Sequence, residues 1–68
     1  MNMRTRIKKE LNILNRMITE TNGDIMKMIN LSAEAEMMLR KKNISEYEAE
    51  VMETKLFKII AGTEKTDH

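Results

Sequence analysis

The chain contains no proline and only two glycines, Gly23 and Gly62, so it has almost none of the residues that interrupt helices. From residue 7 onward, apolar residues recur at steps of three and four, which is the spacing of one face of an α-helix. Cysteine is absent and the single histidine is His68, so disulfides and histidine metal sites are not available to support a small core. These features predict an all-α fold.

The length of 68 residues leaves room for one domain. A domain of this size buries only about 60% of the surface that its unfolded chain exposes, so a monomer would be marginally stable. Self-association is the remaining way to enlarge the core, and we therefore expect a homodimer. We place the single helical domain at residues 1–62 and a disordered polar tail at residues 63–68.

The apolar series keeps its register through Gly23. It favours one long first helix from about residue 2 to about residue 42, bent or locally weak at this glycine. A three-helix arrangement stays open, because Asn22-Gly23 is a turn signal and Asp24 can cap a new helix. The apolar seam is of the kind that pairs helices, and we predict self-association through Ile7, Leu11, Leu14, Ile18, Ile25 and Met28.

The clearest helix boundary lies at residues 42–45. Basic residues precede it, where the negative end of the helix dipole favours them, and Asn43 can adopt the left-handed conformation that ends a helix. Ser45 and Glu48 have the spacing of a capping box, in which each satisfies an amide of the other. A second helix should therefore start at this serine and fold back as an antiparallel helical hairpin.

The second helix is predicted to run from about residue 46 to about residue 61, with Gly62 as its stop. Tyr47 and Val51 lie on the side opposite its core stripe, and Phe57 lies on the flank. These three residues are either simply exposed or in contact with a partner or a second subunit. The predicted core stripe is Ala49, Met52, Leu56, Ile59 and Ile60.

Methionine accounts for eight of the residues, whereas tyrosine and phenylalanine occur once each. Because methionine is flexible and polarizable, a helix face that carries it can repack against partners of different shape, although methionine also fills ordinary helical cores. We predict a partner-binding surface made of Met37, Met38, Tyr47, Val51 and Phe57.

The sequence lacks the residues that would mark an enzyme. It has no nucleophile–base pair, and Glu46, Glu48 and Glu50 alternate around a helix, so they do not converge on a metal. We expect no catalytic activity, cofactor, metal or small-molecule substrate. The N-terminal segment lacks the apolar core of a secretory signal, and no stretch approaches the roughly 20 apolar residues of a membrane span. We therefore expect a cytoplasmic protein without a membrane partner.

Two basic clusters suggest nucleic-acid binding as a competing function. The formal net charge is only +1, however, and the second helix is acidic. Direct nucleic-acid binding is therefore the weaker interpretation, and a small DNA-associated helical protein is kept only as an alternative. The clusters are Arg4, Arg6, Lys8 and Lys9, and Arg40, Lys41 and Lys42.

Three short segments, Ala35-Glu-Met-Met, Ile44-Ser-Glu-Tyr-Glu-Ala and Lys55-Leu-Phe, lie within residues 35–60. This stretch resembles the AraC negative regulator (ANR) family, small virulence regulators of Gram-negative pathogens. The resemblance implies a non-enzymatic protein that binds an AraC-type transcriptional activator and represses it. In size and layout alone, the chain is also similar to the small co-chaperones of type III secretion needle subunits, which supplies a second functional hypothesis.

Overall fold

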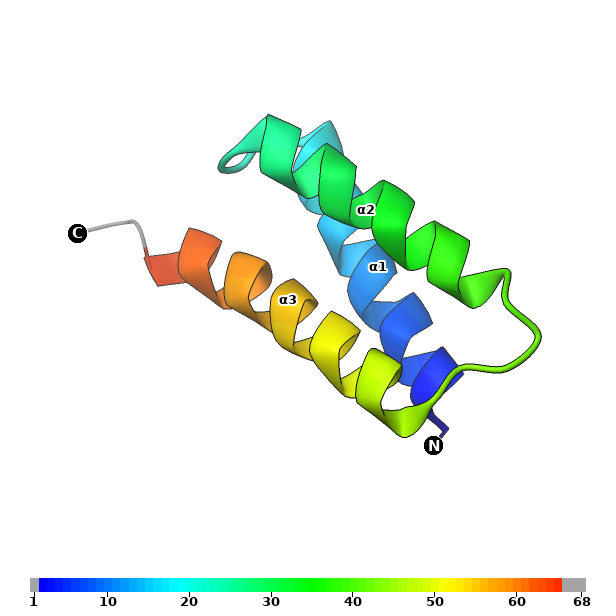
Figure 1. Ribbon diagram of the computed structural model, residues 1–68. Helices are drawn as coiled ribbons and strands as arrows, with labels where there is room; N and C mark the ends of the chain where they lie inside the picture. Colours follow the sequence, from blue (N-terminus) through cyan, green and yellow to red (C-terminus); the bar gives the residue numbers. More distant parts are fainter. Residues whose placement is uncertain (1, 66–68) are drawn as a thin grey trace.

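The structure is a computed structural model that describes residues 2–65, with side chains described for residues 2–62. Three helices form this part of the chain: α1 (Met3–Thr19), α2 (Ile25–Leu39) and α3 (Glu46–Lys65) (Figure 1). No strand occurs among the described residues. The predicted all-α class is confirmed.

The chain leaves its helical path between α1 and α2, so the favoured continuous first helix is wrong and the alternative of three helices, with a break near Gly23, is confirmed. Thr21 has a φ of 54° and Gly23 a φ of 96°, and both values lie in the left-handed region that interrupts a right-handed helix. Asp24 then accepts a hydrogen bond from the backbone N–H of Lys27 at 3.2 Å and caps α2. The apolar register continues through the turn because both helices face the same core.

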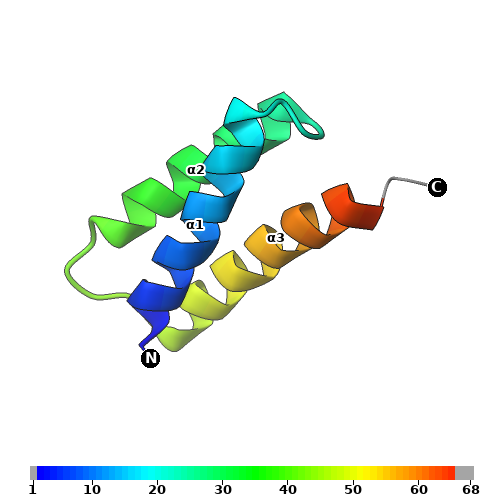
Figure 2. The ribbon, with the colours of Figure 1, turned by 180° about the vertical axis from the view of Figure 1, so that it is seen from behind.

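The start of α1, the end of α2 and the start of α3 lie toward one end of the molecule, and α3 diverges from α1 toward the other end, where a short turn joins α1 to α2 (Figures 1 and 2). α2 returns antiparallel to α1, and Ser32 Oγ donates a hydrogen bond of 2.7 Å to Asn15 Oδ1 between them. α3 starts beside the beginning of α1 and runs in the same general direction, with an ion pair of 3.9 Å between Arg6 and Glu53. The predicted two-helix hairpin is thus replaced by three helices, of which α1 packs against both others.

The core lies between the helices, and α1, α2 and α3 each contribute three of the buried hydrophobic side chains found among the described residues. The aliphatic and methionine side chains fill the space without aromatic residues, so shortening one leaves a cavity; a large-to-alanine change in such a core costs about 2–5 kcal/mol. The buried side chains are Ile7, Leu11, Leu14, Met28, Leu31, Ala35, Ala49, Met52 and Leu56.

The apolar seam predicted to join two chains is used within one chain instead. Ile7, Leu11, Leu14 and Met28 are between 0 and 7% exposed, and Ile18 and Ile25 pack half-buried against the same core. The seam does pair helices, as its spacing indicates, but it pairs α1 with α2 and α3. Self-association stays a prediction, and it requires a different surface.

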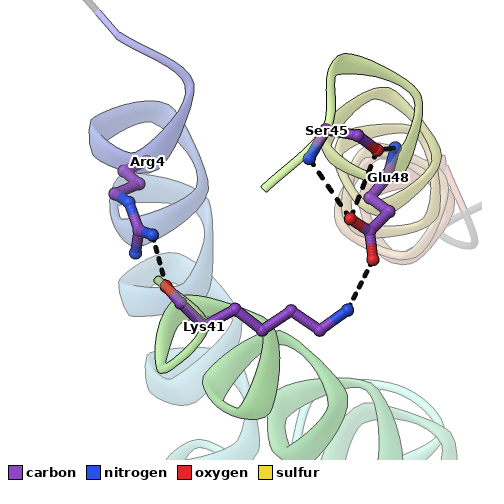
Figure 3. A network of polar contacts seen from close by, with 4 residues as sticks. All are labelled: Arg4, Lys41, Ser45 and Glu48. Atoms are coloured by element: carbon purple, nitrogen blue, oxygen red, sulfur yellow. Dashed lines mark hydrogen bonds and ion pairs between the residues drawn. The ribbon is translucent and has the colours of Figure 1, made fainter. Parts of the chain in front are cut away.

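Arg4 closes the end of the molecule where the helices meet. Its Nη1 donates to the carbonyl of Leu39 at 2.8 Å. Its Nη2 donates to the carbonyl of Lys42 at 3.0 Å and to that of Lys41, and the contact with Lys41 is drawn in Figure 3. These carbonyls lie at the C-terminal end of α2 and just beyond it, where the helix supplies no amide partners of its own. Hydrogen bonds from a charged donor are about twice as strong as neutral ones, so one side chain secures both the end of α2 and the first turn of α1.

The predicted capping box at the start of α3 is present. The backbone N–H of Ser45 donates to Glu48 Oε1 at 3.2 Å, and the backbone N–H of Glu48 donates to Ser45 Oγ at 3.1 Å (Figure 3). Lys41 Nζ lies 2.5 Å from the other carboxylate oxygen of Glu48. The hydrogen bond from Lys41, followed by that from the Ser45 amide, lowers the pKa of Glu48 below its ordinary value.

The predicted end of the last helix at Gly62 is wrong, because α3 continues to Lys65. A Cβ added at Gly62 would meet no described atom within 4 Å, so the glycine faces open space. Of the predicted tail, residues 63–65 belong to α3, and residues 66–68 lie outside the described part of the chain.

We expect Ser45→Ala to lower the free energy of unfolding by about 1 kcal/mol, because it removes the oxygen that accepts the Glu48 amide. Ser45→Asp is the matched control and should be nearly neutral, since a carboxylate caps a helix as well as a hydroxyl does. Urea unfolding followed by far-UV circular dichroism measures both. Equal stability of Ser45→Ala and the parent would contradict this capping role.

Candidate protein-interaction surfaces

α2 is apolar on its outward side as well as on the side that faces the core. The exposed fractions of Met26, Ile29 and Met37 are 66%, 44% and 69%. Together with the exposed Ala33 they are spaced by three, four and four residues, so they follow one side of the helix. Only three of the 15 residues of α2 are charged. A helix that is apolar all round normally lies between two protein layers, and the described chain covers only one side of this helix.

This outward stripe, Met26, Ile29, Ala33 and Met37, is here named the α2 stripe. Only Met37 had been predicted as a binding residue. Met26 and Ile29 repeat the helical spacing beside the core series, but the spacing does not show which of the two apolar faces stays uncovered. They were missed because the interpretation as one long paired helix assigned a single apolar seam to this segment.

The predicted partner-binding residues do not form one surface. Tyr47 and Phe57 are 75% and 64% exposed, but ten residues separate them, which turns the second about 80° around α3 from the first. Val51 is half-buried, and Met38 packs half-buried against the core. Met37 lies on a different helix. The predicted set is therefore divided among the α2 stripe, two sides of α3 and the core boundary.

A groove runs along the side where α2 and α3 do not pack closely against each other, named here the α2–α3 groove. One hollow of about 300 Å³ lies at its open end, next to Gly23, Met28 and Gly62. A neighbouring hollow of about 370 Å³ reaches Leu31 and Glu34. The two hollows share lining residues on both helices, so they form one continuous depression.

The opposite side, between α1 and α3, is acidic and partly desolvated. Glu10 Oε1 is buried and has no hydrogen-bond partner among the described residues. Burial raises the pKa of Glu10 above its ordinary value of 4.5, the charge of Glu53 raises it further, and Arg6 lowers it in part. In the part of the chain that the structure describes, no group of three or more His, Cys, Asp or Glu residues is placed to hold a metal ion.

Two residues of the N-terminal basic cluster, Arg4 and Arg6, make contacts with other residues of the same chain. Arg4 donates to the carbonyls at the end of α2, and Arg6 pairs with Glu53. Lys8 and Lys9 are exposed. Part of the N-terminal basic cluster is thus explained by contacts within the protein, and only its two lysines stay available to a partner.

No family model, curated protein or solved structure significantly matches the chain. The resemblance to the ANR family therefore rests on the three short segments of residues 35–60 alone. Within residues 2–65, no helix has the length and apolar composition needed to cross a membrane.

We expect Glu10→Gln to be more stable than the parent at pH 7, because the ionised carboxylate is then partly buried without a donor. A raised pKa in the folded state favours the fold below the ordinary value of 4.5, and this contribution is lost as pH rises through the folded-state pKa. The advantage of Glu10→Gln should therefore shrink as pH falls through the raised folded-state pKa toward 4.5, and should change little below that value. Thermal unfolding at several pH values measures it, with the exposed Glu36→Gln as control. An advantage that does not change with pH would contradict this account of Glu10.

Proposed function

We propose that this protein is a small non-enzymatic regulator that binds an AraC-type transcriptional activator and represses it through protein–protein contact. The observation that supports it best is the α2 stripe, an apolar helix face that the described chain does not cover. Such a face can occupy an apolar surface of an activator without contact to DNA.

The kind of partner is supported by the position of the resemblance to the ANR family. Met37 belongs to the Ala35-Glu-Met-Met segment and also ends the α2 stripe, and Tyr47 belongs to the second segment and is exposed. Two residues that carry the resemblance are thus available to a partner. A family defined by binding an activator would be expected to keep such residues at its surface.

The physical properties of the stripe suit this role. It is about 16 Å long, or three helical turns. Complete burial of one large apolar side chain contributes about 1.5–3 kcal/mol, and two methionines at the ends can adapt to the shape of the partner. A few such side chains supply most of the binding energy in a typical interface.

Self-association and a cytoplasmic location are part of the proposal. With the first apolar seam buried in the core, the α2 stripe is the surface best suited to a second copy. A dimer and the activator complex would then compete for the same residues. A repressor that acts by contact with a bacterial activator works in the compartment where transcription takes place.

We expect the double variant Met26→Ser, Met37→Ser to keep the helicity of the parent, because both side chains are exposed. It should weaken binding to an AraC-type activator of the same host by about 1–3 kcal/mol, and should lose repression of an activator-driven reporter. Isothermal titration calorimetry and the reporter assay measure the two effects. The matched control is Tyr47→Ser, Val51→Ser, which removes apolar area from the outer side of α3.

Each possible result assigns the function differently. If the α2 variant binds and represses like the parent, the stripe is not the activator interface. If only the α3 control loses repression, the interface lies around Tyr47. Recovery of a secretion needle subunit instead of an activator, when the protein is isolated from its host, would overturn the proposal in favour of the co-chaperone function.

Sedimentation equilibrium tests the self-association part separately. We expect a dimer at micromolar concentration that Met26→Ser, Met37→Ser converts to a folded monomer. A parent protein that stays monomeric at high concentration would refute the dimer and leave activator binding to be judged by calorimetry.

A further inference from the structure

The accessible lining of the α2–α3 groove is mainly apolar, although two of its deepest residues, Met28 and Leu31, are only 1% and 6% exposed. Met28 and Leu31 of α2 and Ile59 of α3 line the two hollows of about 300 and 370 Å³. Met28 and Leu31 belong to the core, so the floor of the groove is the edge of the core itself. A segment seated there would extend the core by a fourth element.

The groove lies between α2 and α3, which run antiparallel on either side of it (Figure 2). Gly62 lies on α3 beside the 300 Å³ hollow, and a Cβ at this position would meet no described atom within 4 Å. Glycine is the least favourable residue for a helix interior after proline. Gly62 therefore leaves the α3 wall without a side chain at this position of the groove.

The acidic side chains around the groove have partners within the described part of the protein, whereas two of the lysine side chains do not. Asp24 accepts the backbone N–H of Lys27 at the cap of α2, and Glu34 pairs with Lys55 at 2.8 Å. Both acidic groups are thus already bound. The ammonium groups of Lys27 and Lys58 line the groove from opposite walls, and among the described residues neither makes an ion pair or hydrogen bond.

We propose that the α2–α3 groove binds an acidic amphipathic helix of a partner protein. An apolar floor between two uncommitted cations matches a helix whose apolar stripe is flanked by glutamate or aspartate on both sides. The α2 wall extends over residues 27–34, about 10 Å, which accommodates about two turns. This surface is separate from the α2 stripe, so the inference does not depend on the proposed function.

A helix suits the groove better than an extended segment does. The walls are formed mainly by two helices, and away from the helix ends their backbone groups are paired within each helix, so a strand would find few partners. A helix satisfies its own backbone hydrogen bonds and can pack side chains into the groove in the manner of a four-helix bundle.

The test uses two synthetic 18-residue helical peptides with the same leucine stripe, one flanked by glutamates and one by lysines. Fluorescence anisotropy with the full chain should show the glutamate peptide binding at least about tenfold more tightly, with a difference that shrinks as salt rises. Lys27→Glu, Lys58→Glu should reverse the preference. Equal affinity for both peptides would overturn the proposal.

Gly62→Phe provides the second arm, because it places a large side chain at the edge of the hollow without a clash at Cβ. We expect it to reduce binding of the glutamate peptide by at least about tenfold while raising the melting temperature, since phenylalanine favours a helix more than glycine does. Gly62→Ala is the matched control and should raise the melting temperature and keep binding. Parent-like binding by a folded Gly62→Phe protein would overturn the proposal.

Two further results identify other occupants. If the parent forms a dimer that Gly62→Phe dissociates, a second copy occupies the groove and the partner-helix proposal fails. If Met26→Ser, Met37→Ser abolishes peptide binding while Gly62→Phe does not, the peptide binds the α2 stripe and the proposal likewise fails. Loss of activator binding by the stripe variant alone leaves the groove proposal supported by the peptide measurements.

Discussion

The guanidinium group of Arg4 joins the first turn of α1 to the end of α2, and the arrangement of the remaining chain depends on this contact. By donating to carbonyls at residues 39, 41 and 42, it satisfies the backbone where α2 ends. The connection at residues 42–45 then crosses near the start of α1, and the capping box begins α3 there. Both outer helices are therefore held near the start of α1, and the groove runs between them.

The two surfaces proposed for binding differ in physical character. The α2 stripe is made of flexible apolar side chains on one helix, so it can adapt to the partner but offers few directional contacts. The α2–α3 groove has fixed walls, an apolar floor and two separated ammonium groups, which favour one charge pattern over another. A protein of this size can in this way carry an adaptable surface and a selective one on the same helix, because α2 contributes to both.

Features encoded by neighbouring residues could be predicted from the sequence. The capping box needs only Ser45 and Glu48, three residues apart, and the core positions Ala49, Met52 and Leu56 follow from helical spacing. The turn at Gly23 could not be predicted in the same way. The apolar residues keep the same spacing whether the first helix continues through Gly23 or ends there and the chain folds back. Its outcome depends on burial of the seam within one chain, which is a tertiary effect.

Prediction of the two binding surfaces would have required even more knowledge of the tertiary structure. Which apolar residues of α2 stay uncovered is decided by where α1 packs, so Met26 and Ile29 could not be separated from core residues before the turn was known. The groove requires the relative directions of two helices, and the role of Arg4 requires a contact across 35 to 38 residues. Sequence periodicity contains neither kind of information.

The distance in sequence between Arg4 and its acceptors also sets an order of events during synthesis. The last acceptor, at Lys42, follows 38 residues later, which at a translation rate of about 5–20 residues per second is a delay of roughly 2–8 seconds. During that time α1 can bury its apolar side only against α2, through contacts that are closer in sequence. The antiparallel pair of α1 and α2 is therefore the first part able to collapse on the ribosome, and α3 docks last, onto a surface that already exists.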